Sequence, residues 1–481
     1  MNSSWVIALP AGVTALTDEQ GRVLVAGWDA GLALRNPTSA MLAAVEHLSY
    51  PGATLPELTR HFQHRSPGEL SRFLRFVRRL AGLGLACFTC LGDDGALATL
   101  EPTAPSLDLS ESFSPESSYR LSRFAYLHRI GDLLVLETPL GPARVTIEDS
   151  RVLIVLAELR TPSTIDKLCD RTGFLSTESA TSLISLLAIA RMITHVTPDG
   201  LPVEDDNASL RQWEFHDLLF HARSRLGRHG DENGAMYHWA GVADPPPPVR
   251  PNYPGEAVSL FRPDLERLAE GDPTLTAVCE SRRSVREYGR RPITAEQLGE
   301  LLYRTARVTS QYDADIELMD GSVRMGFAPR PYPCAGALYE LEIYPVIQQC
   351  GGIAPGIYHH DPLNHALTPV SADRRSLDEL ISCAASRAYV PCEKVQVLLV
   401  FAARFSRINW KYSGIAYSVI LKDVGVLMQS IYLAATAMKL APCALGLGNS
   451  DLFANAIGSD YYAETSVGEF LLGSLPEHES S

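Results

Sequence analysis

The sequence predicts an α+β protein in which a C-terminal catalytic domain follows two small, similarly built modules. The same order of strand and helix signals occurs twice before residue 200, at a spacing of about 110 residues. After residue 273, helical segments alternate with apolar strands, which is typical of an α+β domain. The chain has 481 residues and is therefore too long for a single hydrophobic core.

The first module is predicted at residues 1–100. It begins with the strand-like segments WVIAL and VLVAGW, which we expect to form a hairpin around a turn at residues 18–21. Helical segments follow, and the longest of them begins at Ser66. Pro67 suits the first helical position, and Glu69 lies three residues after the cap, so a capping box is expected here.

The second module, at residues 110–200, repeats this order. LLVLET and ARVTI flank a Pro/Gly turn at residues 139–142, and VLIVLAEL, STIDKLCD and TESATSLISLLAIARMI are predicted helices. The segments that begin at Thr54 and Thr164 hold equivalent places in the two modules. A hairpin followed by three helices and a short strand indicates a winged-helix-like unit.

Winged-helix-like units often bind DNA, and the first long helix carries Arg72, Arg75, Arg78 and Arg79. The corresponding helix of the second module carries only Arg191, and a solvated helix face accounts for all these arginines. The formal net charge of -14 also disfavours binding to nucleic acid or anionic membrane, which depends on clustered cationic side chains. We therefore expect no nucleic-acid partner.

Composition favours a soluble, cytoplasmic protein. Hydrophobic residues make up 46% of the chain and charged residues 20%. No apolar run reaches the roughly 18 residues of a membrane span, and the N-terminus lacks the features of a secretory signal. The nine cysteines are scattered, which favours reduced thiols. Cys87 and Cys90 form a lone CxxC pair that is more typical of a strand than of a zinc or redox site.

Residues 201–272 are predicted to connect the modules to the catalytic domain. They contain an acidic run at residues 204–206, a predicted helix at residues 212–228 and four prolines at residues 245–248.

The catalytic domain is predicted at residues 273–481. Thr294 and Gln297 predict a capping box at the start of one of its helices. A long helix over residues 414–440 is apolar on most faces, so we expect it in the domain core or in a subunit interface.

Two segments of this domain contain the residue types of a cofactor site. Residues 281–286, SRRSVR, place three guanidinium groups and a hydroxyl within about a turn and a half, which suits a phosphate. Residues 332–344, YPCAGALYELEIY, include small residues that let the backbone approach a flat ligand. Taken alone, each segment also fits an ordinary turn or strand. His359 and His360 have no Glu or Cys at metal-ligand spacing and are interpreted as structural.

The order of five motifs makes the interpretation specific. SRRSVREY, YPCAGALYELEIYPV, GIYHHDPLNHAL, NWKYSGIAYSVILKDVG and FLLG follow one another within residues 274–475. This order resembles the SagB-type (McbC-like) azoline dehydrogenases, a branch of the FMN-dependent nitroreductase superfamily. The resemblance implies a nitroreductase-like α+β domain that forms an intertwined homodimer, with FMN at two sites built from both subunits.

The resemblance also implies roles for individual residues. Four residues match the segment that grips the FMN phosphate and ribityl chain: Arg282, Arg283, Ser284 and Arg286. Four match the small-residue loop beside the isoalloxazine, expected to come from the partner subunit: Pro333, Cys334, Ala335 and Gly336. Two match a later loop at the flavin edge: Gly446 and Gly448. Cys334 departs from the serine that is more usual in this loop, and a thiol is a weaker hydrogen-bond donor than a hydroxyl.

Lys411 and Tyr412 match the catalytic Lys-Tyr pair of these dehydrogenases. Conversion of an azoline ring to an azole removes a proton and a hydride from adjacent carbons; a flavin can accept the hydride, and a base must take the proton. Lys411 can serve as that base if burial lowers its pKa, and Tyr412 can share or relay the proton. Adjacent residues of a regular strand point to opposite faces, so both reach one site only where the backbone is irregular.

The sequence thus predicts an FMN-dependent oxidase that aromatises thiazolines or oxazolines in a ribosomally made peptide, with molecular oxygen as the final acceptor. A separate cyclodehydratase would make the rings, and the N-terminal modules would bind the leader of the precursor peptide as an added β-strand. Two alternatives stay open: an NAD(P)H-dependent nitroreductase acting on small molecules, and a leader-binding scaffold without catalytic activity. The large N-terminal half disfavours the first, and the presence of Lys411 and Tyr412 disfavours the second.

Overall fold

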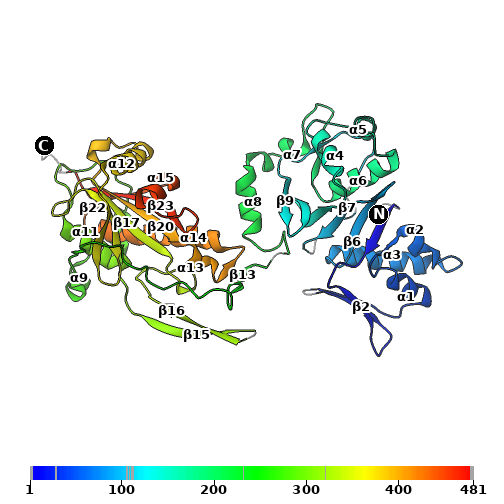
Figure 1. Ribbon diagram of the computed structural model, residues 1–481, viewed down its shortest axis with the longest axis horizontal. Coiled ribbons are helices and arrows are strands. Elements are labelled where there is room, and N and C mark those ends of the chain that lie inside the picture. The colour runs from blue at the N-terminus through cyan, green and yellow to red at the C-terminus, as the bar shows by residue number, and fades with distance from the viewer. Residues whose placement is uncertain are drawn as a thin grey trace. The chain divides into compact units, whose positions relative to one another are not determined.

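The computed structural model describes residues 4–27, 30–104, 107, 109, 113–230, 232–319 and 321–476. The chain divides into two compact units, Met1–Asp231 and Glu232–Ser481 (Figure 1). This division lies inside the predicted connector at residues 201–272. The boundaries assigned to the two modules within the N-terminal unit stay predictions.

One seven-stranded antiparallel sheet runs through the N-terminal unit, in the order β5-β1-β6-β7-β11-β10-β9. Its first four members in chain order come from the first predicted module: β1 (Trp5–Ala8), β5 (Ala53–Thr54), β6 (Cys87–Gly92) and β7 (Gly95–Pro102). Its last three come from the second: β9 (Tyr126–Ile130), β10 (Leu133–Glu137) and β11 (Ala143–Ile147). The pairing of β7 with β11 joins the two halves, so the modules share one sheet and are not separate bodies.

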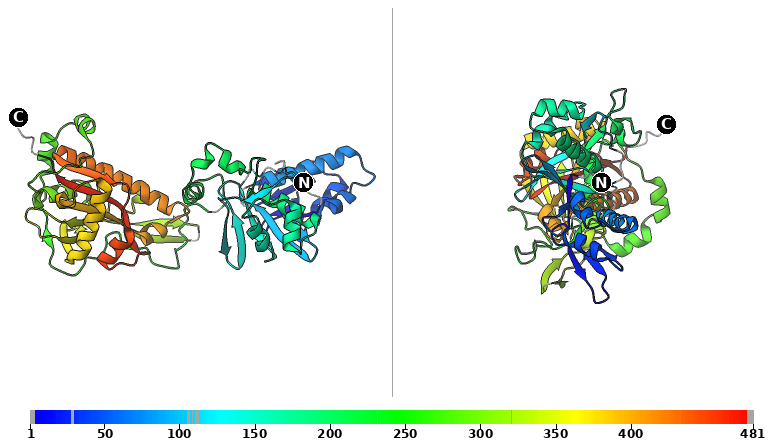
Figure 2. Two further views of the ribbon diagram at one scale, coloured as in Figure 1. Left: turned by 90° about the horizontal axis from the view of Figure 1, so that it is seen from above. Right: turned by 90° about the vertical axis from the view of Figure 1, so that its right-hand side faces the viewer.

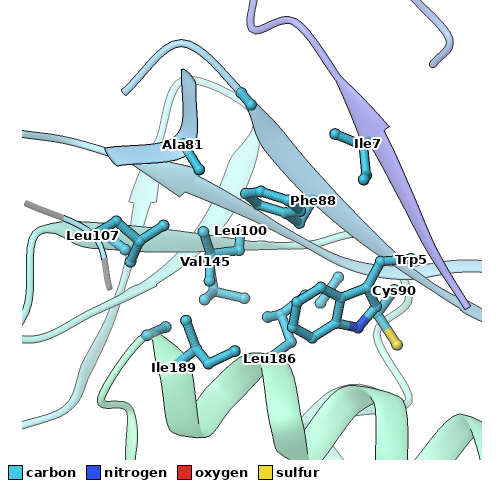
Figure 3. Packing of buried hydrophobic residues seen from close by; sticks show 14 of the residues in the cluster. Trp5, Ile7, Ala81, Phe88, Cys90, Leu100, Leu107, Val145, Leu186 and Ile189 are labelled. Atoms are coloured by element: carbon cyan, nitrogen blue, oxygen red, sulfur yellow. The ribbon is translucent and has the colours of Figure 1, made fainter. Parts of the chain in front are cut away.

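Each half of the N-terminal unit adds three helices. The first half has α1 (Ser39–Glu46), α2 (Leu55–Arg60) and α3 (Pro67–Gly82). The second has α4 (Val152–Glu158), α5 (Ile165–Thr172) and α6 (Thr177–Ile189). Thr54 and Thr164 are the N-caps of α2 and α5, which confirms the equivalence inferred from the sequence. Figure 3 shows side chains of β1, β6, β7 and β11 packed together with α6, so both halves contribute to one hydrophobic core.

Two local predictions for the first half are wrong. The segment WVIAL pairs with β5 and β6 instead of VLVAGW, because Trp5 and Ile7 are fully buried and belong to the core sheet. The hairpin around residues 18–21 consists of β2 (Thr14–Thr17) and β3 (Val23–Ala26), with β4 (Gly31–Leu34) beside β3; the final tryptophan of VLVAGW, Trp28, lies outside the described residues.

The predicted capping box at Ser66 is the second error. Ser66 is the N-cap of α3, but its side chain makes no capping hydrogen bond, because the Glu69 N–H donates to the Ser66 backbone carbonyl. A complete capping box occurs instead at Thr54 and Glu57.

The N-terminal unit ends with short elements. A two-stranded sheet pairs β8 (Tyr119–Leu121) with β12 (Ile193–His195), the closing strand after α6. Then come α7 (Val203–Asp206), the 3-10 turn η1 (Leu210–Gln212) and α8 (Phe215–Arg223). The helix predicted over residues 212–228 is therefore present but shorter.

A second seven-stranded antiparallel sheet forms the centre of the C-terminal unit, in the order β14-β19-β18-β17-β20-β23-β22. Its strands are β14 (Val258–Ser259), β17 (Leu341–Ile347), β18 (Gly356–Asp361), β19 (Ala366–Ser371), β20 (Val397–Arg404), β22 (Leu440–Leu445) and β23 (Glu464–Ser474). The predicted combination of helices and strands in this half of the chain is confirmed.

Helices cover both faces of this sheet. Leu399 and Phe401 of β20 pack in a cluster with α11 (Ala295–Ala306) and α14 (Ala416–Ala437). Leu398 and Val400 pack in a second cluster with α12 (Arg374–Ala388) and α15 (Ser450–Ile457). Successive side chains of a strand point to opposite faces, so the continuous apolar sequence of β20 reflects burial on both sides.

Smaller elements surround these layers. They are α9 (Leu265–Gly271), α10 (Leu275–Ser281), α13 (Phe405–Asn409), the hairpin β15 (Tyr312–Leu318) and β16 (Gly321–Phe327), the pair β13 (Gly234–Ala235) and β21 (Tyr412–Ser413), and the 3-10 turns η2 (Ala335–Ala337) and η3 (Cys392–Lys394). Thr294 and Gln297 form the predicted capping box at the start of α11.

The helix α14 is the predicted long apolar helix and lies along β22 and β23 (Figure 2). Ile420, Leu427 and Ile431 are fully buried in the core, whereas Tyr417 and Leu421 are 48% and 40% exposed. Among the described residues, α14 alone has the length and apolarity of a membrane span. Of its apolar window, 44% is buried inside the protein, and a buried core helix has the same length and apolarity as a membrane span.

Candidate functional site

Lys411 and Tyr412 lie where the chain leaves α13 and enters the two-residue strand β21. The Lys411 N–H donates to the Ile408 carbonyl at 3.2 Å, as in a helical turn, and the Lys411 carbonyl accepts from the Tyr237 N–H. The backbone is thus irregular here. This irregularity is what two adjacent side chains need in order to reach one site.

Both side chains converge on Gly336. A Cβ atom at Gly336 would lie 2.6 Å from Lys411 Nζ and 2.6 Å from the Tyr412 hydroxyl oxygen. The residue also has φ +58°, in the left-handed region that favours glycine. Position 336 therefore requires a glycine, both because of its backbone conformation and because Lys411 Nζ and the Tyr412 hydroxyl leave no space for a Cβ atom.

The surroundings of Lys411 and Tyr412 favour their neutral forms. Burial lowers the pKa of Lys411, and the nearby guanidinium of Arg407 lowers it further. Burial raises the pKa of Tyr412, with a smaller contribution from Tyr237. Lys411 Nζ lies 5.7 Å from the Tyr237 ring centre and 5.3 Å from that of Tyr412. These shifts favour a neutral Lys411 amine, which can accept a proton, beside a Tyr412 hydroxyl that stays protonated.

Two buried carboxylates hold the loop that contains Cys334. The Ala335 N–H donates to the Asp423 carboxylate at 3.1 Å. Cys334 Sγ lies 3.3 Å from Asp423 Oδ2 and 3.2 Å from Glu340 Oε2, and it accepts from the Tyr339 N–H at 3.1 Å. The thiol thus lies within hydrogen-bond distance of two carboxyl groups to which a serine hydroxyl could also donate. Pro333, the preceding residue, is exposed.

We expect Cys334 to react slowly with iodoacetamide at pH 8. Burial raises the pKa of its thiol strongly, the carboxylates of Glu340 and Asp423 raise it further, and the thiolate is the reactive form. The exposed Cys279 and Cys392 provide internal references. Timed alkylation followed by peptide mass spectrometry should label them at least about tenfold faster than Cys334. Equal labelling rates would contradict the protonated thiol.

Residues 282–286 lie in an extended segment that follows α10. The Ser284 hydroxyl is hydrogen-bonded to the Tyr432 hydroxyl at 2.7 Å, and the Arg282 guanidinium lies 5.2 Å from the centre of the Tyr432 ring. Arg283 and Arg286 line a surface cavity of about 460 Å³ together with Ser284. The segment therefore offers cationic groups and a hydroxyl around one open site.

Gly446 and Gly448 line a second cavity, of about 360 Å³, whose other wall is α14. A Cβ atom at Gly448 would lie only 1.9 Å from Glu469 Oε1, so this position requires glycine. A Cβ atom at Gly446 would meet open space. Glu469 is buried, and burial raises its pKa to about 7.

The structure brings together some of the predicted site residues and separates others. Lys411, Tyr412 and the loop around Gly336 meet at one place, near the start of α14. The segment at residues 282–286 contacts α14 at Tyr432, nine residues beyond Asp423. At 1.5 Å per residue, the two contacts are about 13 Å apart along the helix.

Sequence reasoning missed Asp423, Glu340 and Glu469. Asp423 carried a usable signal, because an aspartate at a buried position of an apolar helix needs a polar partner. His359 and His360 are both buried in β18; His359 Nε2 lies 3.1 Å from a Glu342 carboxylate oxygen.

Two family models match the chain. The model of the cyanobactin oxidase ThcOx matches residues 119–230, and that of the nitroreductase family matches residues 279–473. The C-terminal unit contains a nitroreductase-family domain. The resemblance inferred from the order of the five motifs is thereby confirmed, and the nitroreductase domain contains every predicted site residue.

The nitroreductase domain is also similar to individual proteins. A protein assigned to the nitroreductases from Methanocaldococcus jannaschii is 28% identical over 192 residues, which are 40% of this chain and 85% of that protein. Among solved structures, a nitroreductase-assigned protein from Ralstonia eutropha is 18% identical, with a TM-score of 0.35 over 49% of this chain and 98% of that one. A chain of the Escherichia coli microcin synthetase McbBCD complex is 18% identical, with a TM-score of 0.33 over 54% of this chain and 91% of that one.

Proposed function

We propose that this protein is an FMN-dependent oxidase that converts thiazoline or oxazoline rings to thiazoles or oxazoles in a ribosomally made peptide. The observation that carries the proposal is the convergence of Lys411 Nζ and the Tyr412 hydroxyl on Gly336 within a nitroreductase-family domain. The match of residues 119–230 to a cyanobactin oxidase model supports a modified peptide as substrate.

The residues present fit FMN. Within the described part of the chain, Arg283 and Arg286 form no ion pair and border an open cavity, so their guanidinium groups are available to a phosphate. The open space at Gly446 allows a flat ring to approach the backbone closely. Arg282, Arg283, Ser284 and Arg286 would hold the phosphate end, and the two glycine-containing loops would hold the ring. When bound, FMN supplies the hydride acceptor.

Lys411 would take the proton from the azoline ring. Its lowered pKa increases the fraction of neutral amine near neutral pH, which is the form that accepts a proton. Tyr412 would orient the ring by hydrogen bonding or relay the proton, since its hydroxyl lies beside the same glycine. The partial burial of both groups limits access of water to the reacting carbons.

Two copies of the chain would complete each FMN site. The contacts of the phosphate segment and of the Cys334 loop are about 13 Å apart along α14 in one chain, and the exposed face of α14 offers apolar side chains such as Tyr417 and Leu421 to a second copy. Light scattering of the FMN-loaded protein should give the mass of a homodimer.

The N-terminal unit would bind the leader of the precursor peptide. Strand β9 pairs with β10 and is an end member of the large sheet, so its outer edge offers backbone groups to an extended peptide. Binding of the leader there would raise the local concentration of each ring at the catalytic site. A cyclodehydratase would supply the azoline-bearing peptide.

The decisive experiment is mass spectrometry of an azoline-bearing peptide after incubation with the protein. Each oxidised ring should lose about 2 Da, the mass of two hydrogens. Oxidation of a leader-free peptide at the same efficiency would refute leader binding. Absence of the mass change, together with NADPH consumption in the presence of a nitroaromatic compound, would instead support the small-molecule reductase.

We expect Arg286→Ala to weaken FMN binding about tenfold to a hundredfold, because a charge-assisted hydrogen bond contributes about 1.5–3 kcal/mol. The exposed Arg290→Ala provides a matched control that removes a guanidinium four residues away. Flavin fluorescence during titration of the apoprotein measures both affinities. If the two variants bind FMN with equal affinity, residues 282–286 are a solvated basic turn and do not hold the phosphate.

A further inference from the structure

The strongest unexplained feature of the nitroreductase domain is the pair of carboxyl groups beside the Cys334 loop. Glu340 is fully buried and Asp423 is 5% exposed. Each lies within hydrogen-bond distance of Cys334 Sγ, and Glu340 Oε1 has no hydrogen-bond partner among the described residues. The ligand oxygens of the two carboxyl groups lie within 4.8 Å of each other, and two negative charges this close in a buried place destabilise the fold unless a cation compensates them.

No cation in the described part of the chain forms an ion pair with either group. The Arg407 guanidinium donates to the backbone carbonyls of Leu338, Pro246 and Gly326. The Arg330 guanidinium donates to the Leu341 carbonyl. A proton is therefore the simplest counter-charge for the pair, and it lets one carboxyl group donate a hydrogen bond to the other.

The pair is connected to the catalytic groups through the loop. Asp423 accepts the Ala335 N–H, which fixes the peptide next to Gly336. Gly336 in turn is the point on which Lys411 Nζ and the Tyr412 hydroxyl converge. A displacement of this loop would therefore shift the surface against which both groups are aligned, without removing either of them.

We propose that Asp423 and Glu340 are positioning residues for Lys411 and Tyr412, sharing one proton so that Asp423 holds the Cys334 loop in the shape on which the two groups converge. The proposal rests on the proposed function for the reaction that Lys411 and Tyr412 serve. It assigns no substrate contact to either carboxyl group.

The direction of the pKa shifts agrees with a shared proton. Burial and the charge of Asp423 together raise the pKa of Glu340 to about 7, and burial also raises the pKa of Asp423. Other charged and titratable groups that act on the pair are Arg330, Tyr332, Cys334, Tyr339, Arg407, Tyr412 and Lys422.

The sign of the pH dependence follows from the raised pKa of Glu340. The folded protein binds this proton more tightly than the unfolded chain, whose glutamate titrates near 4.5. The stabilisation is therefore complete below that value and is lost as the pH rises through about 7. Above this pH, two like charges lie side by side, and the loop should loosen.

Hydrogen–deuterium exchange of a peptide covering residues 334–339 tests the loop directly and needs no substrate. After correction for intrinsic exchange, Asp423→Ala should exchange at least about tenfold faster than wild type at pH 6.5, because the Ala335 N–H loses its acceptor. Glu340→Gln keeps a donor and does not titrate, so it should match wild type at pH 6.5 and stay protected at pH 8.5, where wild type loosens. Asp378→Ala, an exposed aspartate on α12, is the matched control.

Turnover of an azoline peptide provides the second readout. Asp423→Ala should lower kcat at least about tenfold while KM and FMN occupancy stay near wild type, and Glu340→Gln should abolish the decline in rate above about pH 7. If Asp423→Ala does not fold, Asp423→Asn replaces it. Its amide oxygen still accepts the Ala335 N–H and the side chain does not titrate, so loop exchange should stay at the wild-type rate at pH 6.5 and should no longer rise at pH 8.5.

Three results would overturn the proposal: unchanged exchange in Asp423→Ala, a wild-type loop whose protection does not depend on pH, or a stoichiometric metal found on Cys334, Glu340 and Asp423 by elemental analysis. If wild type does not oxidise any azoline, the proposed function fails, and the exchange experiment still decides whether the pair holds the loop.

Discussion

Replacing Lys411 with alanine is expected to slow azoline oxidation at least about a hundredfold and to leave FMN bound. Removal of the ring proton is the step for which a flavin offers no group, and acid-base assistance is typically worth about 10²–10⁴-fold. The lowered pKa and partial burial of Lys411 support its proposed role as that base. Single-turnover reduction of the bound flavin by an azoline peptide measures the step directly.

Tyr412→Phe is the companion variant, because it keeps the ring that packs beside Lys411 and deletes the hydroxyl near Gly336. A smaller but clear reduction in rate is expected if this oxygen orients or relays the proton. Loss of FMN in either variant would indicate a structural role for the pair. Near-normal turnover with bound FMN would remove both residues from the mechanism.

The second large effect is expected from Gly336→Ala, which should reduce turnover at least about tenfold. The added Cβ would approach both Lys411 Nζ and the Tyr412 hydroxyl oxygen at 2.6 Å, so at least one of these groups must move. The left-handed backbone adds a cost of about 1–2 kcal/mol for a residue with a Cβ. A displacement of a catalytic group by about 1 Å can lower the rate about a hundredfold. We therefore expect the free energy of the catalytic barrier to change more than the free energy of unfolding.

Gly271→Ala is the matched control, since a Cβ at this helical position of α9 meets nothing within 4 Å. It should leave turnover unchanged and raise stability by about 0.5–1 kcal/mol through the better helix propensity of alanine. Thermal unfolding and kcat measured on both variants separate the two effects. If Gly336→Ala lowers the unfolding temperature and leaves kcat at the wild-type value, the convergence on Gly336 has no catalytic meaning.

Local signals in the sequence predicted local structure well. The capping box at Thr294 and the hairpin around residues 139–142 depend on neighbouring residues, and both are present. The order of five motifs identified the nitroreductase domain because each motif combines special residues at set spacings.

Contacts between distant parts of the chain could not be predicted in this way. Asp423 lies 89 residues from Cys334, and no local pattern indicates that its carboxylate accepts the Ala335 N–H. The pairing of β7 with β11 could not be predicted either. In the sequence each strand is recognisable only as a member of its own hairpin, and no local pattern indicates which strand lies on its other side. The failed capping at Ser66 shows the opposite limit: the residue types fit, but a backbone carbonyl already accepts the Glu69 N–H.

The pairing of β7 with β11 has a consequence for how this protein evolves. If the two halves of the N-terminal unit arose by duplication, they are no longer exchangeable parts, because deletion of one would leave an unpaired strand edge and half of a hydrophobic core exposed. Recombination with related pathways can therefore transfer the unit only as a whole. Under the proposed function, specificity for a new peptide must then arise by substitutions within it, and a single cooperative unfolding transition should be inherited with them.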